Sequence, residues 1–507
     1  MAQQLQNITV AAPGFMGLNT QDSPIGGDPS FAAVADNCVI DKLGRIGARK
    51  GWEAVSSNGA AVLGSSRGIE SVFEYVKRDG TKIVFSAGNN KIFTGTSTLA
   101  AVTLPSGYSI SANNWKIVSF NNDVYFFQRG HAALVSVAGS TTLIAVADGG
   151  TAAPAANEVL AAYGRLWAAD ITANKYVVYW SDLLDGDDWH GGSSGSLDLT
   201  LVWPTGFDEV VALSAHNGFL IIFGKKSMIV YSGAAAPASM TLSDTIEGIG
   251  CIARDSVQHT GADILFLSDT GVRSLGRTIQ EKSLPLNDLS KNVRTDLTSL
   301  VPLQTNAIKS LYSADEAFYL LTLPDSDTTY CFDMRSPLQD GSQRATTWSG
   351  LHPLAFTTTE AGDIYFGLSS GIVKYTGYLD GTANYQMRYF SNPMDFGNAS
   401  NLKFLKKFNI TIIGGQNTNS TLNWGYDYST NFTKQVFTLT GSVNAGEYGV
   451  SEYNTTAEYT ATAIINTPKV NTSGSGEIVT IGIETEINDT AFSIQKIDIH
   501  ALLGRLI

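Results

Sequence analysis

A hairpin that recurs along the middle of the chain restricts the fold more than any other feature. Each copy reads as an apolar strand, a tight turn of Gly, Asn or Asp, a second apolar strand and a polar loop, as in "IVSFNNDVYFFQRG" at 117–130. The turns step along the chain by 42, 54, 43, 54 and 47 residues, with anchors at Asn122, Gly164, Gly218, Gly261, Asp315 and Gly362. A four-stranded propeller blade with its loops takes about 40–50 residues. The spacing predicts an irregular β-propeller of five to seven blades, with six favoured, because the first and last repeats can share strands with the N-terminal segment.

The pattern divides the chain into three parts. Residues 67–380 carry the repeats and form the expected propeller body, and the rhythm breaks near 378–400. Beyond the break, 402–507 alternates apolar and polar residues with period two in about seven strand-sized segments, which predicts a β-sandwich-like C-terminal domain over 381–507. Residues 1–66 remain as an extended N-terminal arm. The content of 50 Gly, 20 Tyr and 23 Phe suits an all-β chain of many short strands.

One segment has helical periodicity. Within "LNDLSKNVRTDLTSLVP" at 286–302, one helical face is shared by Leu289, Val293, Leu297 and Leu300, and Pro302 ends the pattern. We expect a single helix here, inserted between two blades.

Charge and cysteine content restrict the partners and the compartment. The formal net charge of −13 argues against a protein that grips nucleic acid by neutralising phosphates, although it permits one that lets nucleic acid slide past. The three cysteines, Cys38, Cys251 and Cys331, have neither metal-ligand spacing nor a disulfide pattern, so we expect synthesis in a reducing cytosol. The N-terminus lacks the basic and apolar regions of a secretory signal, and the apolar runs are only strand-sized. We therefore expect a soluble protein without a membrane span.

An Asp-rich loop is the most pointed candidate for chemistry. The segment "SDLLDGDDWHGG" holds Asp182, Asp185, Asp187 and Asp188, followed by His190. Several carboxylates from one loop could bind a cation such as Ca²⁺, and a pair of acids could serve glycoside hydrolysis. The segment lacks the EF-hand spacing and its terminal Glu, and Asp and Gly also favour ordinary turns. We interpret the loop as a solvated turn, with an incidental cation site at these four Asp residues and catalysis as the alternatives.

Common catalytic motifs are missing from the sequence. It contains no H-E-x-x-H, G-x-S-x-G or G-x-x-x-x-G-K-[ST] pattern, and "LSDTGVRS" at 267–274 lacks the Trp of the sialidase Asp turn. We predict that the protein is not an enzyme and uses no cofactor or catalytic metal.

The first fifty residues do not read as a self-sufficient core. In "CVIDKLGRIGAR", Asp41 and Gly44 bracket a type I turn, so that Ile40 faces Ile46 across a short hairpin. Before the hairpin, Pro24 and Pro29 with several Gly residues predict an extended course. Such an arm is stable only when it docks on another domain or another subunit.

Three segments together carry a family resemblance. The first is the pattern Gly17-x-Asn19, Ser23-Pro24, Asn37, Asp41-x-x-Gly44-Arg45 and Arg49-x-Gly51. The others are "LWAAD…YVVYWSDLLDGDDW" at 166–189 and "GEIVTIGIETEINDTAFSIQKIDIHALLGRL" at 476–506. They resemble the start, the middle and the end of the tail nozzle (tail tubular B-type) proteins of short-tailed bacteriophages. Several such proteins are longer and have larger insertions, which implies that the outer platform is reduced in this protein.

The resemblance implies a structural role in a virion. Such proteins form a homo-hexameric ring below the portal and adaptor, extend the DNA channel, retain the genome until ejection and offer docking surfaces to tail fibres or spikes. The protein would be made in the host cytoplasm and reside in the virion tail. Genomic DNA would pass without sequence-specific binding, since acidic walls repel phosphate.

Residues of the arm are the candidate assembly contacts under this interpretation, namely Asn19, Pro24, Asn37, Arg45 and Arg49. Two alternatives stay open, a receptor- or glycan-binding tail component and a propeller glycan depolymerase.

Overall fold

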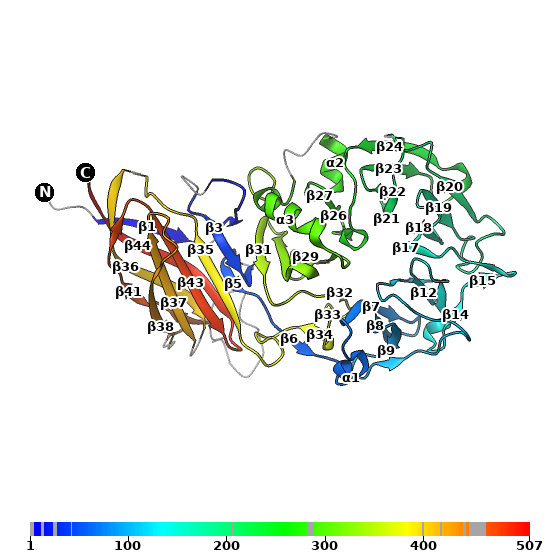
Figure 1. Cartoon of the computed structure of the whole chain (residues 1–507), viewed down its shortest axis with the longest axis horizontal. Coiled ribbons are helices and arrows are strands. Elements are labelled where there is room, and N and C mark those ends of the chain that lie inside the picture. Colours follow the sequence, from blue (N-terminus) through cyan, green and yellow to red (C-terminus); the bar gives the residue numbers. More distant parts are fainter. Residues whose placement is uncertain are drawn as a thin grey trace.

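The computed structural model describes residues 5–11, 15–23, 28–41, 43–204, 206–281, 288–397, 400–415, 418–439, 443–445 and 463–506. Within these ranges the regular structure is mostly β, arranged as a ring of sheets and a two-sheet sandwich (Figure 1). Among the described residues, no helix is both long enough and apolar enough to cross a membrane.

Among the described residues, the ring contains five separate four-stranded sheets, one three-stranded sheet and four strands of a ten-stranded sheet that continues into the sandwich. The first sheet consists of β7 (Ile69–Val76), β8 (Lys82–Gly88), β9 (Lys91–Thr94) and β10 (Ala100–Ala101). The second consists of β11 (Lys116–Phe120), β12 (Asp123–Phe127), β13 (Leu134–Ser136) and β14 (Ile144–Ala145). The third consists of β17 (Ala156–Ala162), β18 (Arg165–Ile171), β19 (Val177–Trp180) and β20 (Gly195–Asp198). A small hairpin of β15 (Ala147–Asp148) and β16 (Thr151–Ala152) precedes the third sheet.

The remaining sheets complete the ring. The fourth consists of β21 (Val210–His216), β22 (Phe219–Gly224), β23 (Ser227–Ser232) and β24 (Thr241–Glu247), and the fifth of β25 (Gln258–His259), β26 (Ile264–Ser268) and β27 (Gly271–Ser274). The sixth consists of β28 (Lys309–Ser313), β29 (Phe318–Leu323), β30 (Thr328–Asp333) and β31 (Arg344–Trp348). The last consists of β32 (Ala355–Thr358), β33 (Ile364–Leu368), β34 (Gly371–Tyr375) and β6 (Trp52–Ala54). Strands β32 and β33 contact β7, so the last sheet closes the ring on the first. The predicted irregular propeller is confirmed.

The turns that gave the repeat spacing lie between the first and second strands of successive sheets. Asn122 has a φ of 69° and Gly218 a φ of 82°, in the left-handed region that tight hairpin turns require. Asn and Gly adopt this region at low cost, which explains why the repeat is punctuated by these two residue types.

The predicted helix at 286–302 is shorter in the structure. Helix α3 covers only Arg294–Leu300, between 3-10 turns at Lys291–Val293 and Val301–Leu303, because Val293 N–H donates to the Ser290 carbonyl three residues earlier. The apolar face is as expected, since Leu289, Val293 and Leu297 are buried. Residues 286–287 lie outside the described residues, and two helices not predicted are α1 (Gly59–Leu63) and α2 (Leu275–Glu281).

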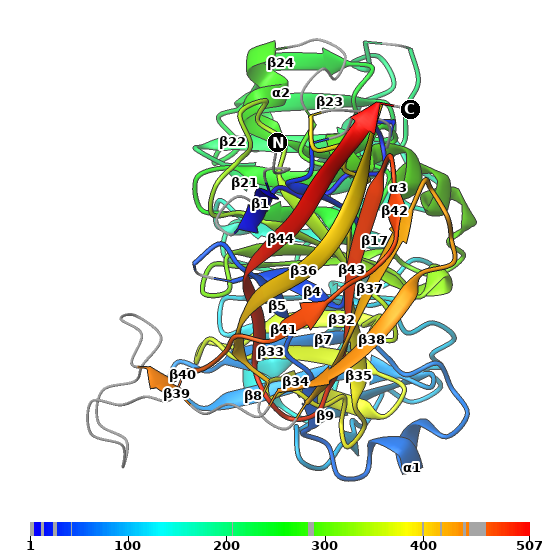
Figure 2. The ribbon, with the colours of Figure 1, turned by 90° about the vertical axis from the view of Figure 1, so that its left-hand side faces the viewer.

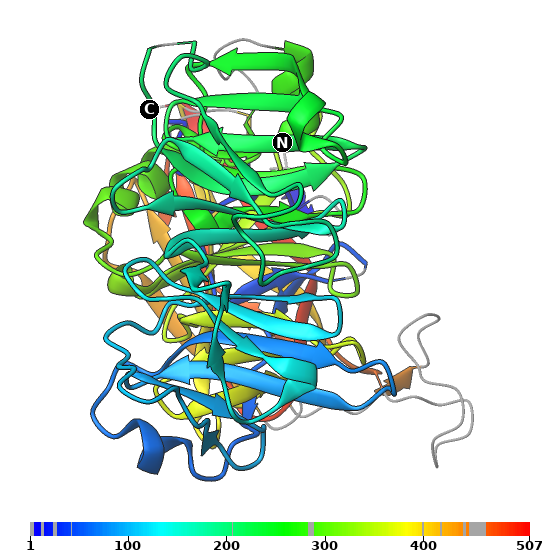
Figure 3. The same cartoon turned by 90° about the vertical axis from the view of Figure 1, so that its right-hand side faces the viewer.

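Aromatic side chains pack the adjoining propeller sheets together. Edge-on pairs join Phe85 of β8 to Phe126 of β12 and Phe318 of β29 to Tyr375 of β34, with ring centres 5.2 and 6.1 Å apart. Burial of each such ring contributes roughly 1.5–3 kcal/mol. Figure 3 views the ring from the end opposite the sandwich.

The sandwich faces the viewer in Figure 2. Its first sheet holds β36 (Asn401–Gly414) and β44 (Phe492–Leu506) with β1 (Leu5–Ala11), β4 (Cys38–Ile40), β5 (Ile46–Ala48), β39 (Val443–Ala445), β40 (Ala463–Asn466), β41 (Lys469–Asn471) and β42 (Ser475–Gly476). Its second sheet holds β2 (Gly17–Leu18), β3 (Phe31–Asp36), β35 (Tyr385–Ser391), β43 (Val479–Ile487), β37 (Asn419–Tyr426) and β38 (Thr433–Thr438). Inward residues such as Phe408, Ile483 and Ile499 form one core between the sheets, so the predicted C-terminal β-sandwich is confirmed.

The N-terminal arm is shared between the two bodies. Strands β1, β3, β4 and β5 belong to the sandwich, whereas β6 is the fourth strand of the last propeller sheet. Strand β3 also pairs with β31 at Asp36 and Thr347, so one ten-stranded sheet runs from the propeller into the sandwich. The arm therefore ties the two domains of its own chain together.

Candidate functional site

The joint between propeller and sandwich is built on Arg49, a candidate assembly residue. Its guanidinium is fully buried and donates to both carboxylate oxygens of Asp380, at 2.8 and 2.7 Å. Nε donates to Asn37 Oδ1 at 2.8 Å, and the cation lies 4.1 Å from the ring centre of Tyr385. These contacts satisfy the charge inside the chain, where an unpaired guanidinium would be costly.

Asn37 connects the same joint to both domains. Its backbone N–H donates to the Thr347 carbonyl of β31 at 2.7 Å, and its Nδ2 donates to the Gln386 carbonyl of β35 at 2.9 Å. The residue has a φ of 55°, which Asn tolerates better than most residues. Asn37 therefore directs the chain from β3 into the hairpin of β4 and β5.

The other candidate assembly residues stabilise local turns. Asn19 Oδ1 accepts hydrogen bonds from the N–H groups of Gln21 and Asp22, and buried Arg45 pairs with Asp41 at 2.6 Å within the hairpin. Pro24 lies outside the described residues. Four of the five candidates are thus buried in contacts with their own chain.

Of the four Asp residues of the predicted cation site, all within the described ranges, no three bring carboxylate oxygens within 4.8 Å of one another. Asp182 accepts from the Ser193 N–H and hydroxyl, Asp185 from the N–H groups of Asp187 and Asp188, and Asp188 from those of His190 and Gly191. Hydrogen bonds from Ser193 hold the pKa of Asp182 below its usual value, and those from His190 and Gly191 do the same for Asp188. Each of these three carboxylates is occupied in shaping its own turn.

A different set of ligand atoms comes together at this loop. Asp148 of β15, Asp188 and His190 place one ligand atom each within 4.8 Å of one another, the one such group in the part of the chain described. His190 Nδ1 lies 3.4 Å from Asp188 Oδ1, which already accepts two backbone hydrogen bonds. Asp148 was not predictable as a member of this group, because it lies 40 residues before Asp188 in the chain.

A Ser–His contact on the inner strands bears on catalysis. Ser214 Oγ of β21 lies 2.9 Å from His259 Nε2 of β25. Ser214 is fully buried, so a substrate has no access to its hydroxyl. Burial also lowers the pKa of His259, and the pair reads as packing between two sheets.

The most concentrated group of charges lies where the first strands of the sheets meet. Arg254 donates to Asn157 Oδ1 at 3.1 Å and Asn114 Oδ1 at 2.7 Å, and its Nε and Nη2 reach the two carboxylate oxygens of Asp255 at 3.0 and 2.8 Å. Lys309 adds bonds to Asp255 at 2.8 Å and to Asn114 at 2.5 Å. We call these five residues the axial network.

Electrostatics within the axial network favour the ionised pairs. Burial alone would raise the pKa of Asp255, but Arg254 and Lys309 beside it hold that pKa well below its usual range. Burial lowers the pKa of Lys309, against the opposing effect of Asp255. Glu158 of β17 is also buried, and desolvation raises its pKa despite Lys116, whose Nζ lies 3.5 Å from Glu158 Oε2.

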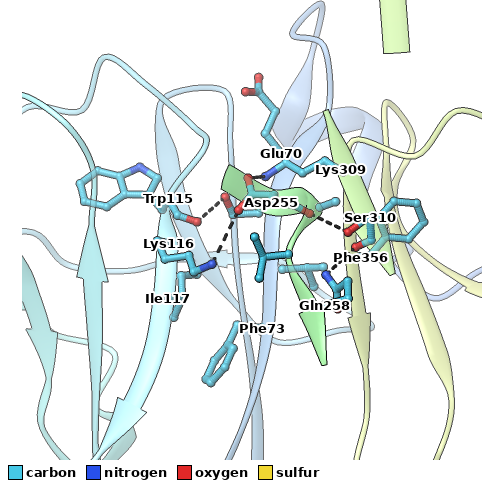
Figure 4. Close-up of a pocket in the computed structure, with 14 residues that line it drawn as sticks. Glu70, Phe73, Trp115, Lys116, Ile117, Asp255, Gln258, Lys309, Ser310 and Phe356 are labelled. Atoms are coloured by element: carbon cyan, nitrogen blue, oxygen red, sulfur yellow. Dashed lines mark hydrogen bonds and ion pairs between the residues drawn. The ribbon is translucent and has the colours of Figure 1, made fainter. Parts of the chain in front are cut away.

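Two cavities flank the axial network. The first, of about 170 Å³, is lined by residues from β7, β11, β25, β28 and β32, including Glu70, Lys116, Asp255, Lys309 and Phe356 (Figure 4). The second, of about 290 Å³, is lined by residues that include Arg254, Asp255 and Asn306. Because Asp255 lines both, the network forms the wall between them. We call the first one the axial cavity.

The sequence contains a signal for the axial network that was not among the predicted sites. Lys116 and Lys309 each open the first strand of a repeat, and Asp255 stands just before another, in segments that are otherwise apolar. Charged residues at or just before the first strands of several repeats point to the centre of a propeller, where the first strands meet.

No family model matches the chain, and no curated protein matches its sequence. Among solved structures, it is similar to the computationally designed Ika8 protein, at 13% identity over 64% of this chain and 99% of that chain, with a TM-score of 0.37. It is also similar to YCF48 from Cyanidioschyzon merolae, at 13% identity over 64% and 98%, with a TM-score of 0.39. The extracellular domain of a hybrid two-component system from B. thetaiotaomicron matches at 10% identity over 80% of this chain and 59% of that chain, with a TM-score of 0.44. These similarities are too low to compare functions.

Proposed function

We propose that the protein is a structural component of a bacteriophage tail, a nozzle ring that extends the DNA channel below the portal and adaptor. The observation that carries the proposal is the structural role of the residues that form the family resemblance in the N-terminal segment. Gly17, Asn37, Arg49 and Gly51 each occupy a position whose geometry demands that residue type. A Cβ at Gly17 would lie 2.7 Å from Ala345 N, and one at Gly51 would overlap the Leu379 carbonyl.

This geometry supports a subunit built around its N-terminal segment. The pattern residues hold the propeller and the sandwich in one arrangement through the Arg49–Asp380 pair and the shared ten-stranded sheet. A ring that retains a packaged genome needs subunits whose domains do not shift under load. The two-domain joint supplies that stiffness.

The distribution of charge supports a path for DNA. Residues 151–250 contain eleven Asp and Glu against four Lys and Arg, and eight of these acids and three of these bases are half-buried or exposed. They supply the sheets β17–β20 and β21–β24, which lie far from the sandwich (Figure 1). We infer that this acidic end faces the channel of a homo-hexamer, because an acidic wall lets DNA pass without neutralising its phosphates. The sandwich then faces the tail adaptor and the fibres or spikes.

Assembly and location test the proposal. Native mass spectrometry of the purified chain, with negative-stain microscopy, should show a ring of six 54.1 kDa subunits. Gold-labelled antibody should bind the tails of virions of the phage that encodes the chain. A strict monomer that is absent from purified virions would overturn the proposal.

Charge reversal tests the path of DNA separately. Glu247 of β24 is exposed on the acidic end, so Glu247→Lys in all subunits should slow DNA release and make its rate more dependent on salt. Asp269→Lys, at an exposed turn outside the acidic sheets, is the matched control and should leave release unchanged. Equal release from both variants would contradict an acidic lumen at β17–β24.

A further inference from the structure

The axial cavity has the chemistry of a small binding site. It is lined by buried and half-buried polar and aromatic side chains, mostly from the first strands of five sheets, with Lys116 and Lys309 reaching toward Asp255 (Figure 4). We propose that this cavity binds one small neutral polyhydroxylated molecule, about the size of a single sugar ring. The proposal concerns the propeller of a single chain and does not depend on ring assembly.

The charges of the lining select a neutral ligand. The cavity presents two ammonium groups, Lys116 and Lys309, and two carboxylates, Asp255 and Glu70. A ligand anion would meet the two carboxylates, and a ligand cation would meet the two lysines. In a partly dehydrated cavity either repulsion costs more than in water. A molecule without net charge avoids both.

The lining has both hydrogen-bond donors and hydrogen-bond acceptors that the protein does not fully use. Within the described residues, Lys116 Nζ has no hydrogen bond, and its nearest carboxylate oxygens are 3.5 Å away on Glu158 and 3.9 Å away on Asp255. Glu158 Oε2 behind it is buried and has no hydrogen-bond partner among the same residues. Glu70 uses one carboxylate oxygen to accept from Asn113 Nδ2 at 3.3 Å. Hydroxyl groups satisfy such a lining because each one both donates and accepts.

The rest of the lining is fixed and offers apolar surface. Ser310 Oγ donates to the Asp255 carbonyl at 2.7 Å, and Gln258 Nε2 donates to the Ser310 carbonyl at 3.1 Å, so this wall is preorganised. Phe73 and Phe356 are half-buried at the cavity and can pack on the C–H face of a sugar.

The size of the cavity limits the ligand to one ring. Its volume of about 170 Å³ is below the roughly 300–1,000 Å³ of sites that enclose drug-sized ligands. At the binding energy per atom usual for small ligands, a monosaccharide of about twelve non-hydrogen atoms binds with a Kd on the order of millimolar.

Saturation-transfer NMR on the full-length protein tests the proposal. The probes are three neutral sugars, D-glucose, D-galactose and N-acetyl-D-glucosamine, with D-glucuronate and D-glucosamine as charged counterparts at equal ionic strength. At least one neutral sugar should saturate in the millimolar range, and more tightly than both charged sugars. Absence of saturable binding by all three neutral sugars, or tighter binding of a charged one, would overturn the proposal.

Two variants locate the binding. Lys116→Met removes the ammonium that has only long ion pairs, at 3.5 and 3.9 Å, and should weaken binding of the same sugar at least fivefold. The control is Lys175→Met, since Lys175 has similar exposure, pairs with Glu209 at 3.3 Å and lies outside the cavity lining. Phe356→Leu keeps an apolar side chain, so it tests the site even where Lys116→Met fails to fold, and it should also weaken binding. Unchanged affinity in Phe356→Leu, or in a folded Lys116→Met protein, would show that the sugar binds elsewhere.

Discussion

Arg49 and Asp380 form a two-bond fork at the joint between the propeller and the sandwich, with N–O distances of 2.8 and 2.7 Å. The Arg49 side chain is 0% exposed and that of Asp380 is 17% exposed, so the pair is largely shielded from water. The same guanidinium contacts Asn37, Tyr385 and the Lys50 carbonyl. One side chain thus connects the N-terminal segment to the residues that leave the propeller and enter the sandwich.

Replacing Arg49 by Lys tests this joint. Lys keeps the charge but cannot donate in a fork, so Asp380 and Asn37 would each lose a partner in a buried site. We expect the free energy of unfolding to fall by about 3–5 kcal/mol, measured by urea denaturation. The control Arg67→Lys changes a pair 3.7 Å apart with Arg67 42% exposed, and should cost less than about 1 kcal/mol. Similar losses in both variants would contradict a special role of the joint.

Two variants of Asn37 test the backbone conformation at the same joint. Asn37→Ala and Asn37→Gly both remove the side-chain bonds to Arg49, Ser349 and Gln386. The φ of 55° strains Ala but not Gly, so the Ala variant should unfold about 1 kcal/mol more easily than the Gly variant. Equal or reversed stabilities in the same urea titration would show that the left-handed conformation is not retained.

The fold was predictable where a hairpin turn or the regular spacing of the repeats determines it. The hairpin turns at Asn122 and Gly218 mark the first and second strands of their sheets, because only a few residue types tolerate positive φ there. The number of sheets was not predictable in the same way. The last sheet takes its fourth strand, β6, from residues 52–54, more than 300 residues before its other strands. A local pattern contains no information on such a long-range pairing.

The candidate sites were harder to predict than the fold. The Asp-rich loop attracted a cation interpretation because acids cluster in the sequence, yet Asp182 and Asp185 turn their oxygens toward backbone N–H groups. The axial network instead combines Asn114, Asp255 and Lys309 from separate repeats. These three residues are neighbours because the ring brings the first strands of its sheets together. In the sequence they can be related to one another only by aligning the repeats.

Glu158 makes stability depend on pH. Its pKa is raised mainly by burial, so its contribution to stability is complete below the unfolded-state pKa near 4.5 and is lost as pH rises through the folded-state pKa. Glu158→Gln removes this titration. The Tm of the variant minus that of the original protein should therefore increase as pH rises from about 4.5 toward 8, measured by calorimetry.

Glu209→Gln is the control for that measurement because its sign is opposite. Hydrogen bonds from Lys225 and Lys175 lower the pKa of Glu209, so its contribution is present above the unfolded-state pKa and lost as pH falls through the folded-state pKa. The Tm difference for Glu209→Gln should become more negative with rising pH. Parallel slopes for the two variants would rule out a raised pKa at Glu158.

Gly51 places the strictest steric limit on the joint. A Cβ at this position would overlap the backbone of Leu379, while Gly51 N–H donates to the Gly377 carbonyl at 3.0 Å and Trp52 N–H to the Leu379 carbonyl at 2.7 Å. Gly51→Ala must push apart the two chain segments that bring β6 to β34, which should cost about 3 kcal/mol or more in urea denaturation. Gly80→Ala is the control, because a Cβ there meets nothing within 4 Å and only the φ of 84° adds strain, of about 1 kcal/mol. A Gly51→Ala protein as stable as Gly80→Ala would show that β6 does not close the last propeller sheet in this manner.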